Sequence, residues 1–264
     1  MKYWAGGVPR VMEEIREVLH LDVMTVTGKT PGENLDELKS SGYYDRCDEE
    51  CARVGLHWQD IIRPYGEAIG TDGAIAILKG NLAPGGAVIK HTACPKEMFR
   101  AVLRARPFDC EEDALAAVLR HDITAGDAVF IRYEGPKGSG MPEMFYTSEA
   151  ISSDPRLGRS IALITDGRFS GASTGPSIGH VSPEAAEGGL IALVEEGDLI
   201  LIDIPARRLE IVGIAGKECP PEEIAAALEK RKAAWVKPQT RYRRGVLRLF
   251  TENARSPMEG GGMD

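Results

Sequence analysis

The sequence has 264 residues, of which 43% are hydrophobic and 27% charged, a balance that allows an ordinary packed core and argues against global disorder. Lysine and arginine total 32 against 40 aspartates and glutamates, and the net charge of −8 argues against nucleic acid or an anionic membrane as the main partner. The length suits one large domain or two small ones.

Two further features bear on the location of the protein. No apolar stretch reaches the roughly 18 residues of a membrane span, and the N-terminus, MKYWAGGVPRVMEEI, lacks the apolar core of a signal peptide. The five cysteines are an odd number in a chain too long to be a disulfide scaffold, which favours a reducing compartment. We therefore expect a cytoplasmic protein without membrane contact.

The first 60 residues predict helices and polar connections. Apolar side chains recur at helical intervals over residues 8–20, where Pro9 is tolerated in the first turn, and a short helix is expected around 32–40. Residues 41–60 are polar and irregular by pattern. We expect residues 1–60 to be a helical or linker segment that packs on the domain that follows.

From about residue 61 the pattern changes to short β-branched runs bounded by Gly, Pro or Asp. Helical patterns lie among these runs and after them. Strands outnumber helices and are irregularly spaced, so we predict an α+β fold over 61–250, in which a β-barrel or sandwich is flanked by helices. The glycine-rich end, 251–264, should be a disordered tail. The predicted strands are 74–80, 87–93, 128–135, 160–167, 190–205 and 208–214, and the predicted helices are 94–105, 109–121 and 220–236.

The stretch TDGRFSG follows one of the predicted strands, which should deliver Ser170 to the rim of the sheet. An isolated serine becomes a useful base or nucleophile only if a cation or metal stabilises its alkoxide. Arg168 could supply that charge or grip a substrate carboxylate. There is no GxSxG motif and no known triad order, which argues against a serine hydrolase. The residue types alone fit equally well a polar turn whose serine caps the segment that follows.

The loop EGPKGSGMPEMFYTS (134–148) holds the second candidate, Glu143, which lies between Met141, Pro142 and Met144. A carboxylate with apolar neighbours is costly to bury unless it meets a cation, and Mg²⁺ takes such hard oxygen ligands. A phosphate-cradling loop or a plain surface loop is the alternative. The string GPKGSG, which includes Lys137, lacks the spacing of a nucleotide-binding P-loop.

Weaker candidates are spread along the chain. Asn81 and Lys90 could contact a ligand from the turn KGNLAPGGAVIKHTA, although glycine and proline explain most of that stretch as geometry. His180, near the serine loop, is a candidate for substrate contact, and a structural histidine is the alternative. Cys47 and Cys51 lack the second pair that zinc binding requires. The stretch TVTGKTPGENL (25–35) could form an anion site, but a surface loop is favoured.

The order and wording of these loops resemble the C-terminal portion of the dihydroxy-acid dehydratase and 6-phosphogluconate dehydratase family. The resemblance covers roughly residues 5–215 and is closer to the dihydroxy-acid branch. Several specific strings occur in series. They are AGGVPRVM, TVTGKTPGENL, GNLAPGGAVIK, EGPKGSGMPEM, LITDGRFSGAS and GHVSPEAAEGG.

The resemblance implies a hydro-lyase of branched-chain amino acid biosynthesis that removes water from a 2,3-dihydroxy acid to give a 2-keto acid by way of an enol. It implies an iron–sulfur cluster that acts on the 3-hydroxyl and a Mg²⁺ that binds the carboxylate and 2-hydroxyl. By position in the motifs, Ser170 matches the serine base and Glu143 a magnesium ligand. Asp166, Arg168 and Gly171 would shape the pocket and bind the substrate. The implied fold is a barrel like the swivelling domain of aconitase-type enzymes.

The resemblance also implies a missing part. The family's cluster cysteines, further magnesium carboxylates and carbamylated lysine lie in an N-terminal domain, and none of the five cysteines here matches a cluster motif. We therefore expect an iron–sulfur-bearing partner domain or subunit, a shared Mg²⁺, self-association as in the family, and no activity of this chain alone. A split subunit is favoured over an excised domain by Met1, the polar start and the tail.

Two functional hypotheses follow. In the first, the chain is the base-bearing half of a dehydratase and works at an interface with its partner. In the second, it is a non-catalytic binding or regulatory module that kept the barrel and binds a small sugar-acid-like or amino-acid ligand. An exposed apolar patch on the face that carries Ser170 would favour the first, because a domain separated from its partner bares its interface.

Overall fold

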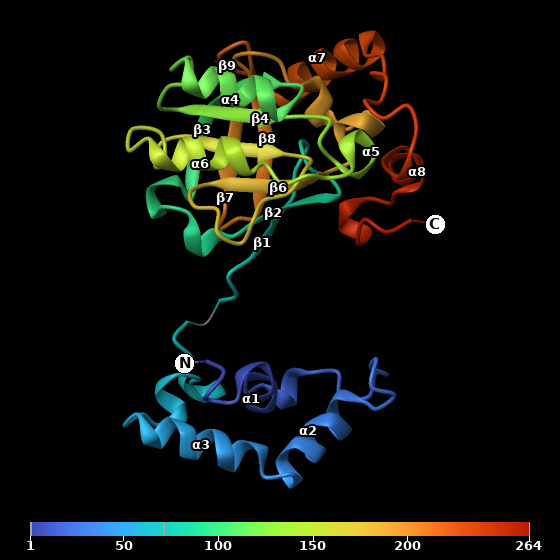
Figure 1. Ribbon diagram of the computed structural model, residues 1–264. Helices are drawn as coiled ribbons and strands as arrows, with labels where there is room; N and C mark the ends of the chain where they lie inside the picture. Colours follow the sequence, from blue (N-terminus) through green and yellow to red (C-terminus); the bar gives the residue numbers. More distant parts are fainter. Residues whose placement is uncertain (1, 71, 264) are drawn as a thin grey trace. The chain divides into compact units, whose positions relative to one another are not determined.

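The computed structural model describes residues 2–70 and 72–263, and the chain divides into two compact units, Met1–Gly73 and Ala74–Asp264 (Figure 1). The boundary between the units therefore falls at Gly73 rather than at residue 60. Each unit has its own hydrophobic clusters. The packing of residues 1–60 on the barrel stays a prediction.

The N-terminal unit is helical. It contains α1 (Gly7–Glu14) and α2 (Pro31–Ser40), and the first of these is shorter than the pattern over 8–20 predicts, since a 3₁₀ turn takes over at Arg16–Val18. A capping box, in which Thr30 and Glu33 each bond the other's backbone amide, starts α2 at the expected place.

The expectation of irregular structure over 41–60 was wrong for much of that segment. Residues Tyr43–Arg53 form α3, a mostly polar helix whose one apolar stripe consists of Tyr44, Cys47 and Cys51. The charged residues of the other positions mask this stripe in the sequence. The stripe becomes decisive only when it meets the rest of the unit, because tertiary packing supplies most of the stability of short helices.

A cation holds the N-terminal unit together. The Arg10 guanidinium of α1 lies 4.4 Å from the ring centroids of both Tyr44 and Trp58, and its Nη2 is 2.6 Å from an oxygen of Asp48. Ring faces carry partial negative charge, so they compensate a cation that is otherwise costly to bury.

The C-terminal unit is built on one nine-stranded sheet in the order β1-β2-β6-β5-β4-β3-β7-β8-β9. Its centre, from β3 through β4 and β5 to β6, is parallel, and the remaining pairings are antiparallel. The strands are β1 (Ala76–Leu78), β2 (Gly86–Ile89), β3 (Arg100–Phe108), β4 (Asp127–Ile131), β5 (Ala162–Thr165), β6 (Ser177–Ser182), β7 (Leu199–Asp203), β8 (Arg208–Ile214) and β9 (Lys217–Glu218).

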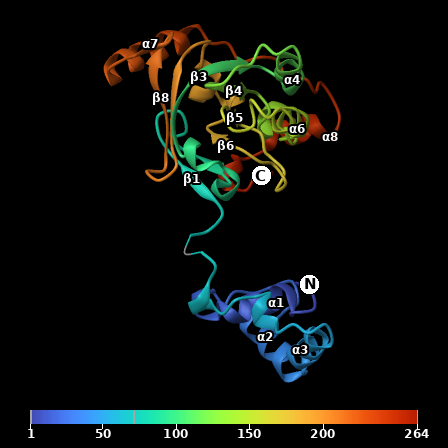
Figure 2. The ribbon, with the colours of Figure 1, turned by 90° about the vertical axis from the view of Figure 1, so that its left-hand side faces the viewer.

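The parallel strands are buried on both faces. Phe130 of β4 and Ile164 of β5 point into the larger core, whereas Val129 and Leu163 belong to a second cluster on the opposite face. Two helices cover that second face, α4 (Glu111–Leu119) and α6 (Phe145–Ser153), which lie side by side in both views (Figures 1 and 2). Double-sided burial explains why these strands read as continuous apolar runs.

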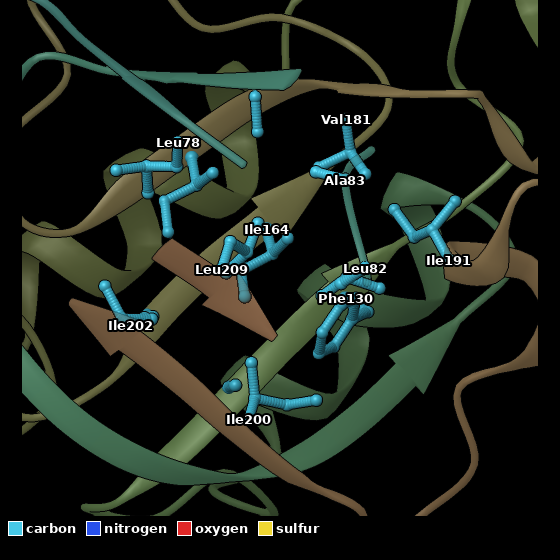
Figure 3. Packing of buried hydrophobic residues seen from close by; sticks show 14 of the residues in the cluster. Leu78, Leu82, Ala83, Phe130, Ile164, Val181, Ile191, Ile200, Ile202 and Leu209 are labelled. Carbon is cyan, nitrogen blue, oxygen red and sulfur yellow. The ribbon is translucent and has the colours of Figure 1, made fainter. Parts of the chain in front are cut away.

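The sheet curls around the larger core, so that its two ends approach each other (Figure 2). Lys79, just after β1, bridges Arg208 of β8, with a backbone bond of 2.9 Å from the Lys79 N–H to the Arg207 carbonyl. Large aliphatic side chains fill the interior, among them Leu78, Ile200 and Ile202 (Figure 3). The mixed α+β fold is confirmed, and the predicted barrel is formed only in part.

Three strands were not predicted: β3, β6 and the two-residue β9. Residues 94–105, expected as a helix, form a 3₁₀ turn at Lys96–Met98 and most of β3, and β6 lies in a stretch that was not recognised as a strand. Strand β3 pairs with β4 on one side and β7 on the other, which buries Leu103 and Ala105. Pairing with strands distant in sequence outweighs the local helical spacing.

The later elements agree better with the expectations. Helix α7 (Pro221–Ala234) is confirmed within the range predicted for it, and the run 190–205 divides into a 3₁₀ turn at Leu190–Leu193 and β7. The prediction of a disordered tail was wrong for the described residues 251–263. Residues 251–263 contain the end of α8 (Val246–Asn253), a 3₁₀ turn at Pro257–Glu259 and a bridge between Ala254 and Met263.

Candidate functional site

The loops that follow β4, β5 and β6 share one edge of the sheet, because the carboxyl ends of parallel strands lie together. At the end of β5 the buried Asp166 carboxylate accepts backbone N–H bonds from Tyr133 (3.1 Å), Glu134 (2.9 Å) and Ala185 (2.8 Å). Burial raises its pKa to about 6. Asp166 thus ties the loops after β4 and β6 to β5, and its full burial does not support the predicted direct contact with substrate.

A second buried carboxylate stabilises the neighbouring loop. Glu184 accepts bonds from the backbone N–H groups of Lys137 (2.9 Å) and Gly138 (2.9 Å), and burial raises its pKa to about 7. These amides belong to the short helix α5 (Pro136–Ser139). The geometry of the segment that leads to Glu143 is therefore fixed in part by Glu184, which the sequence did not single out.

Glu143 and Arg168 lie side by side in a parallel bridge between the two candidate loops. The Met144 N–H donates to the Arg168 carbonyl (3.0 Å), and the Arg168 Nε donates to the Met141 carbonyl (2.9 Å). The Arg168 Nη1 is 3.3 Å from the Glu143 Oε1. Both side chains are exposed, so the structure brings Glu143 to the loop of Ser170 but leaves its carboxylate open to solvent.

Ser170 lies on a pocket of about 250 Å³. Ile75, Val88 and Phe169 give the pocket apolar walls, and Lys90 and His180 add polar groups. The Ala172 N–H donates to the Ser170 Oγ over 3.1 Å. A donor aimed at this oxygen would stabilise it as an alkoxide.

His180 reaches the pocket from β6. Its backbone has a φ of 57°, which is uncommon for a residue other than glycine, and its N–H donates to the Gly167 carbonyl over 2.8 Å. Burial, aided by the charge of Arg168, lowers the pKa of the imidazole below its ordinary value near 6.5. The downward shift favours the neutral imidazole, which is a hydrogen-bonding group without charge.

The remaining candidates have structural partners. Both atoms of the Asn81 side-chain amide bond the backbone of Ile211, at 2.8 and 2.9 Å, which favours the interpretation of that turn as geometry. Lys137 pairs with Glu187. Cys47 and Cys51 are buried thiols on α3.

The loop 25–35 is held by bonds among its own side chains. Thr27 donates to Asn34 over 3.0 Å, and the Asn34 amide donates to Thr25 over 3.2 Å. Because these polar groups satisfy one another, the loop fits the favoured reading as a surface loop.

The two implied metal groups differ in their fit to this chain. The Glu143 carboxylate is a hard, exposed oxygen donor that could serve as one magnesium ligand, but across residues 2–70 and 72–263 no group of three His, Cys, Asp or Glu side chains could hold a metal ion. The cysteines do not gather into a cluster site, and Cys47, Cys51 and Cys94 are buried. An iron–sulfur cluster therefore does not fit the described residues.

Comparison with known proteins identifies the family of the chain. Residues 60–261 match the family described as Dihydroxy-acid/6-phosphogluconate dehydratase C-terminal. The chain therefore belongs to that dehydratase family, as its C-terminal domain.

The curated relatives are longer proteins. A dihydroxy-acid dehydratase of Solidesulfovibrio magneticus is 47% identical over 97% of this chain and 42% of its own length. One from Ignicoccus hospitalis is 44% identical over 98% and 43%, and dihydroxy-acid dehydratase 1 of Methanosarcina acetivorans is 46% identical over 98% and 43%. The chain thus spans less than half the length of the curated relatives it matches.

One finding bears on membranes. Among the helices that the structure describes, none combines the length and the apolar character needed to cross a bilayer.

Proposed function

We propose that this chain supplies the serine base and one magnesium ligand of a hydro-lyase that converts a 2,3-dihydroxy acid to a 2-keto acid. The observation that carries the proposal is the backbone bridge between Glu143 and Arg168, which brings Glu143 beside the loop that carries Ser170. The bridge brings the stretch of Glu143 beside the loop whose residues Phe169, Ser170 and Gly171 line a small pocket with apolar walls.

The chemistry assigned to Ser170 is proton removal from C2 of the substrate. The C2–H electron pair becomes the C2–C3 double bond of an enol as the C3–O bond breaks, and the departing hydroxide takes up a proton and leaves as water. The enol then becomes the 2-keto acid by losing its hydroxyl proton and gaining a proton at C3. Ser170 accepts the C2 proton as an alkoxide, which the Ala172 N–H stabilises.

Glu143 would hold the magnesium ion, and Arg168 keeps its carboxylate beside the serine loop. When bound, Mg²⁺ supplies positive charge to the substrate's carboxylate and 2-hydroxyl. Asp166 acts as a positioning residue that joins the two loops through backbone amides. Gly171 borders the pocket, and Arg168 acts on the substrate through Glu143.

The proposal includes a partner that carries the iron–sulfur cluster and the other magnesium ligands, either as a separate subunit or as another part of a longer protein. Phe145 and Tyr146 follow Glu143 directly and are 47% and 67% exposed. Aromatic side chains bared beside a candidate ligand are typical of an interface that lacks its other face. Self-association and a closed barrel in the assembled enzyme belong to the same proposal.

The test combines this chain with an iron–sulfur-bearing partner and measures 2-keto acid formed from a branched 2,3-dihydroxy acid. Ser170→Ala should lower kcat by about 10²–10⁴-fold, because it removes a proton transfer. Ser152→Ala, which changes an exposed hydroxyl on α6, should keep full activity. Full activity of the Ser170→Ala protein would exclude the serine base.

The alternative is a non-catalytic module that binds a small sugar-acid-like or amino-acid ligand. Its support is that the chain spans only 42–43% of the length of three of its relatives, so that much of the dehydratase has no counterpart in this chain. Copurification separates the two. A brown complex with an iron–sulfur protein favours the enzyme, whereas a colourless chain that binds such a ligand alone favours the module.

A further inference from the structure

The loop that carries Ser170 is tied to a segment some eighty residues earlier in the chain. The Lys90 ammonium donates to the Gly171 carbonyl, and the Gly175 N–H donates to the Ala93 carbonyl over 3.0 Å. Lys90 directly follows β2, and β2 pairs with β6, Val88 lying opposite Gly179. The sheet therefore fixes the position from which Lys90 reaches the loop.

The Lys90 ammonium donates to the carbonyl of Gly171, the residue directly after the candidate base Ser170. Within the loop itself the turn is closed by local bonds, from the Ala172 N–H to the Ser170 Oγ and from the Ser173 N–H to the Ser170 carbonyl, each 3.1 Å. Local bonds close a turn but do not fix its orientation relative to the sheet. The Lys90 bond joins the turn to the sheet at the residue after Ser170.

Lys90 also determines the charge of the pocket. Among the described residues that line the pocket, Lys90 is the one lysine or arginine side chain. The Arg168 guanidinium is engaged with the Met141 carbonyl and the Glu143 carboxylate. A fixed cation close to a hydroxyl favours its ionised form, and an ammonium on one acceptor retains further donors.

We propose that Lys90 is a positioning residue for Ser170, which orients the 170–173 turn through the Gly171 carbonyl and places a positive charge at the pocket. This inference rests on the proposed function of Ser170 for its catalytic consequence. The tie to the turn can be measured without any partner or activity.

The first measurement is amide hydrogen exchange of residues 171–173 by NMR in the full chain. Lys90→Met removes the charge and the donor but keeps much of the aliphatic stem, and exchange at these amides should become about tenfold faster as the turn opens more often. Lys90→Arg should restore slow exchange, because a guanidinium can also donate to the carbonyl. Lys96→Met, which changes an exposed lysine six residues later, is the control.

The second measurement uses the enzyme assembled with its iron–sulfur-bearing partner. Lys90→Met should lower kcat about 10- to 100-fold with KM within threefold, Lys90→Arg should recover most of the loss, and Lys90→Met should have no further effect in a Ser170→Ala background. A loss that appears in KM instead would overturn the positioning role, and so would unchanged amide exchange in Lys90→Met.

The two proposals fail separately. If the Ser170→Ala enzyme keeps its activity, the proposed function is wrong, and the exchange data still decide whether Lys90 holds the turn. If Ser170→Ala is inactive but Lys90→Met exchanges and turns over like the unmodified protein, the proposed function stands and the role of Lys90 is refuted.

Discussion

Asp166 and Glu184 show how a residue type can point to chemistry while the structure uses it for architecture. Asp166 stands in a motif with a serine and an arginine, yet its carboxylate is buried and accepts three backbone N–H bonds. Glu184 accepts bonds from two backbone amides of α5. Carboxylates that satisfy loop amides fix loop geometry, and the reactive candidates Ser170 and Glu143 depend on that geometry.

Substitution by alanine should lower stability at one glycine of the site and leave it unchanged at another. A Cβ at Gly138 would lie 2.2 Å from the Tyr133 carbonyl oxygen, whereas a Cβ at Gly171 meets no atom within 4 Å. We expect Gly138→Ala to lower the free energy of unfolding by about 2 kcal/mol or more, and Gly171→Ala to change it by less than about 0.5 kcal/mol. Urea unfolding of both variants measures this.

Gly171→Ala should affect the activity of the assembled enzyme more than it affects stability. Because Gly171 borders the pocket, an added methyl group there should reduce turnover although stability is unchanged. A Gly171→Ala enzyme with normal kcat and KM would show that the open space beside Gly171 is not used by substrate or partner.

At the scale of elements, strand β3 is the clearest case of tertiary context overriding local pattern. The segment before and within it has helical spacing of apolar residues, but β4 and β7 flank it and supply backbone partners on both sides. The reverse occurs in the N-terminal unit, where α3 forms although its sequence is mostly polar. Both cases arise because the stabilising contacts are distant in sequence.

Glu184, whose carboxylate accepts bonds from the amides of α5, should make the stability of the protein depend on pH. Its pKa is raised to about 7 by burial, above the value near 4 of a carboxyl group in an unfolded chain, so between these values the folded state binds more protons than the unfolded state. The contribution of Glu184 to the free energy of unfolding therefore falls as pH rises from about 4 to 7.

Glu184→Gln removes this ionisation and keeps an oxygen that can accept from the α5 amides. Relative to the unmodified protein, the variant should gain stability between pH 5 and pH 8, as measured by urea midpoints at intervals of one pH unit. Glu218→Gln, at an exposed position of β9, should run parallel to the unmodified protein. A Glu184→Gln curve that also ran parallel would contradict the assigned cause.

At the scale of the whole molecule, the hydrophobic clusters are separate. The cluster of Ala5, Cys51 and Ile62 lies within Met1–Gly73, and the two larger clusters draw only on residues of Ala74–Asp264. Each unit is thus described with a hydrophobic core of its own.

We therefore expect a fragment of residues 74–264 to fold alone. It should unfold cooperatively at the urea midpoint that the C-terminal unit shows in the full chain, because its core is complete without the N-terminal unit. Dispersed NMR spectra and near-ultraviolet circular dichroism would check this. A fragment that retains helical signal but loses fixed aromatic signals would show that the units stabilise each other.

The sequence by itself determined the apolar runs of β4 and β5, the helix α7, the series of loop motifs, and Ser170 and Glu143 as the residues to examine, because each of these is written in neighbouring residues. Only the tertiary structure decided that β3 is a strand, that the Asp166 carboxylate is buried against three backbone amides, that the barrel closes only in part and that Lys90 reaches the serine loop. These depend on strand pairing and burial between segments far apart in the chain, and no local pattern encodes which distant backbone or charge a residue will meet.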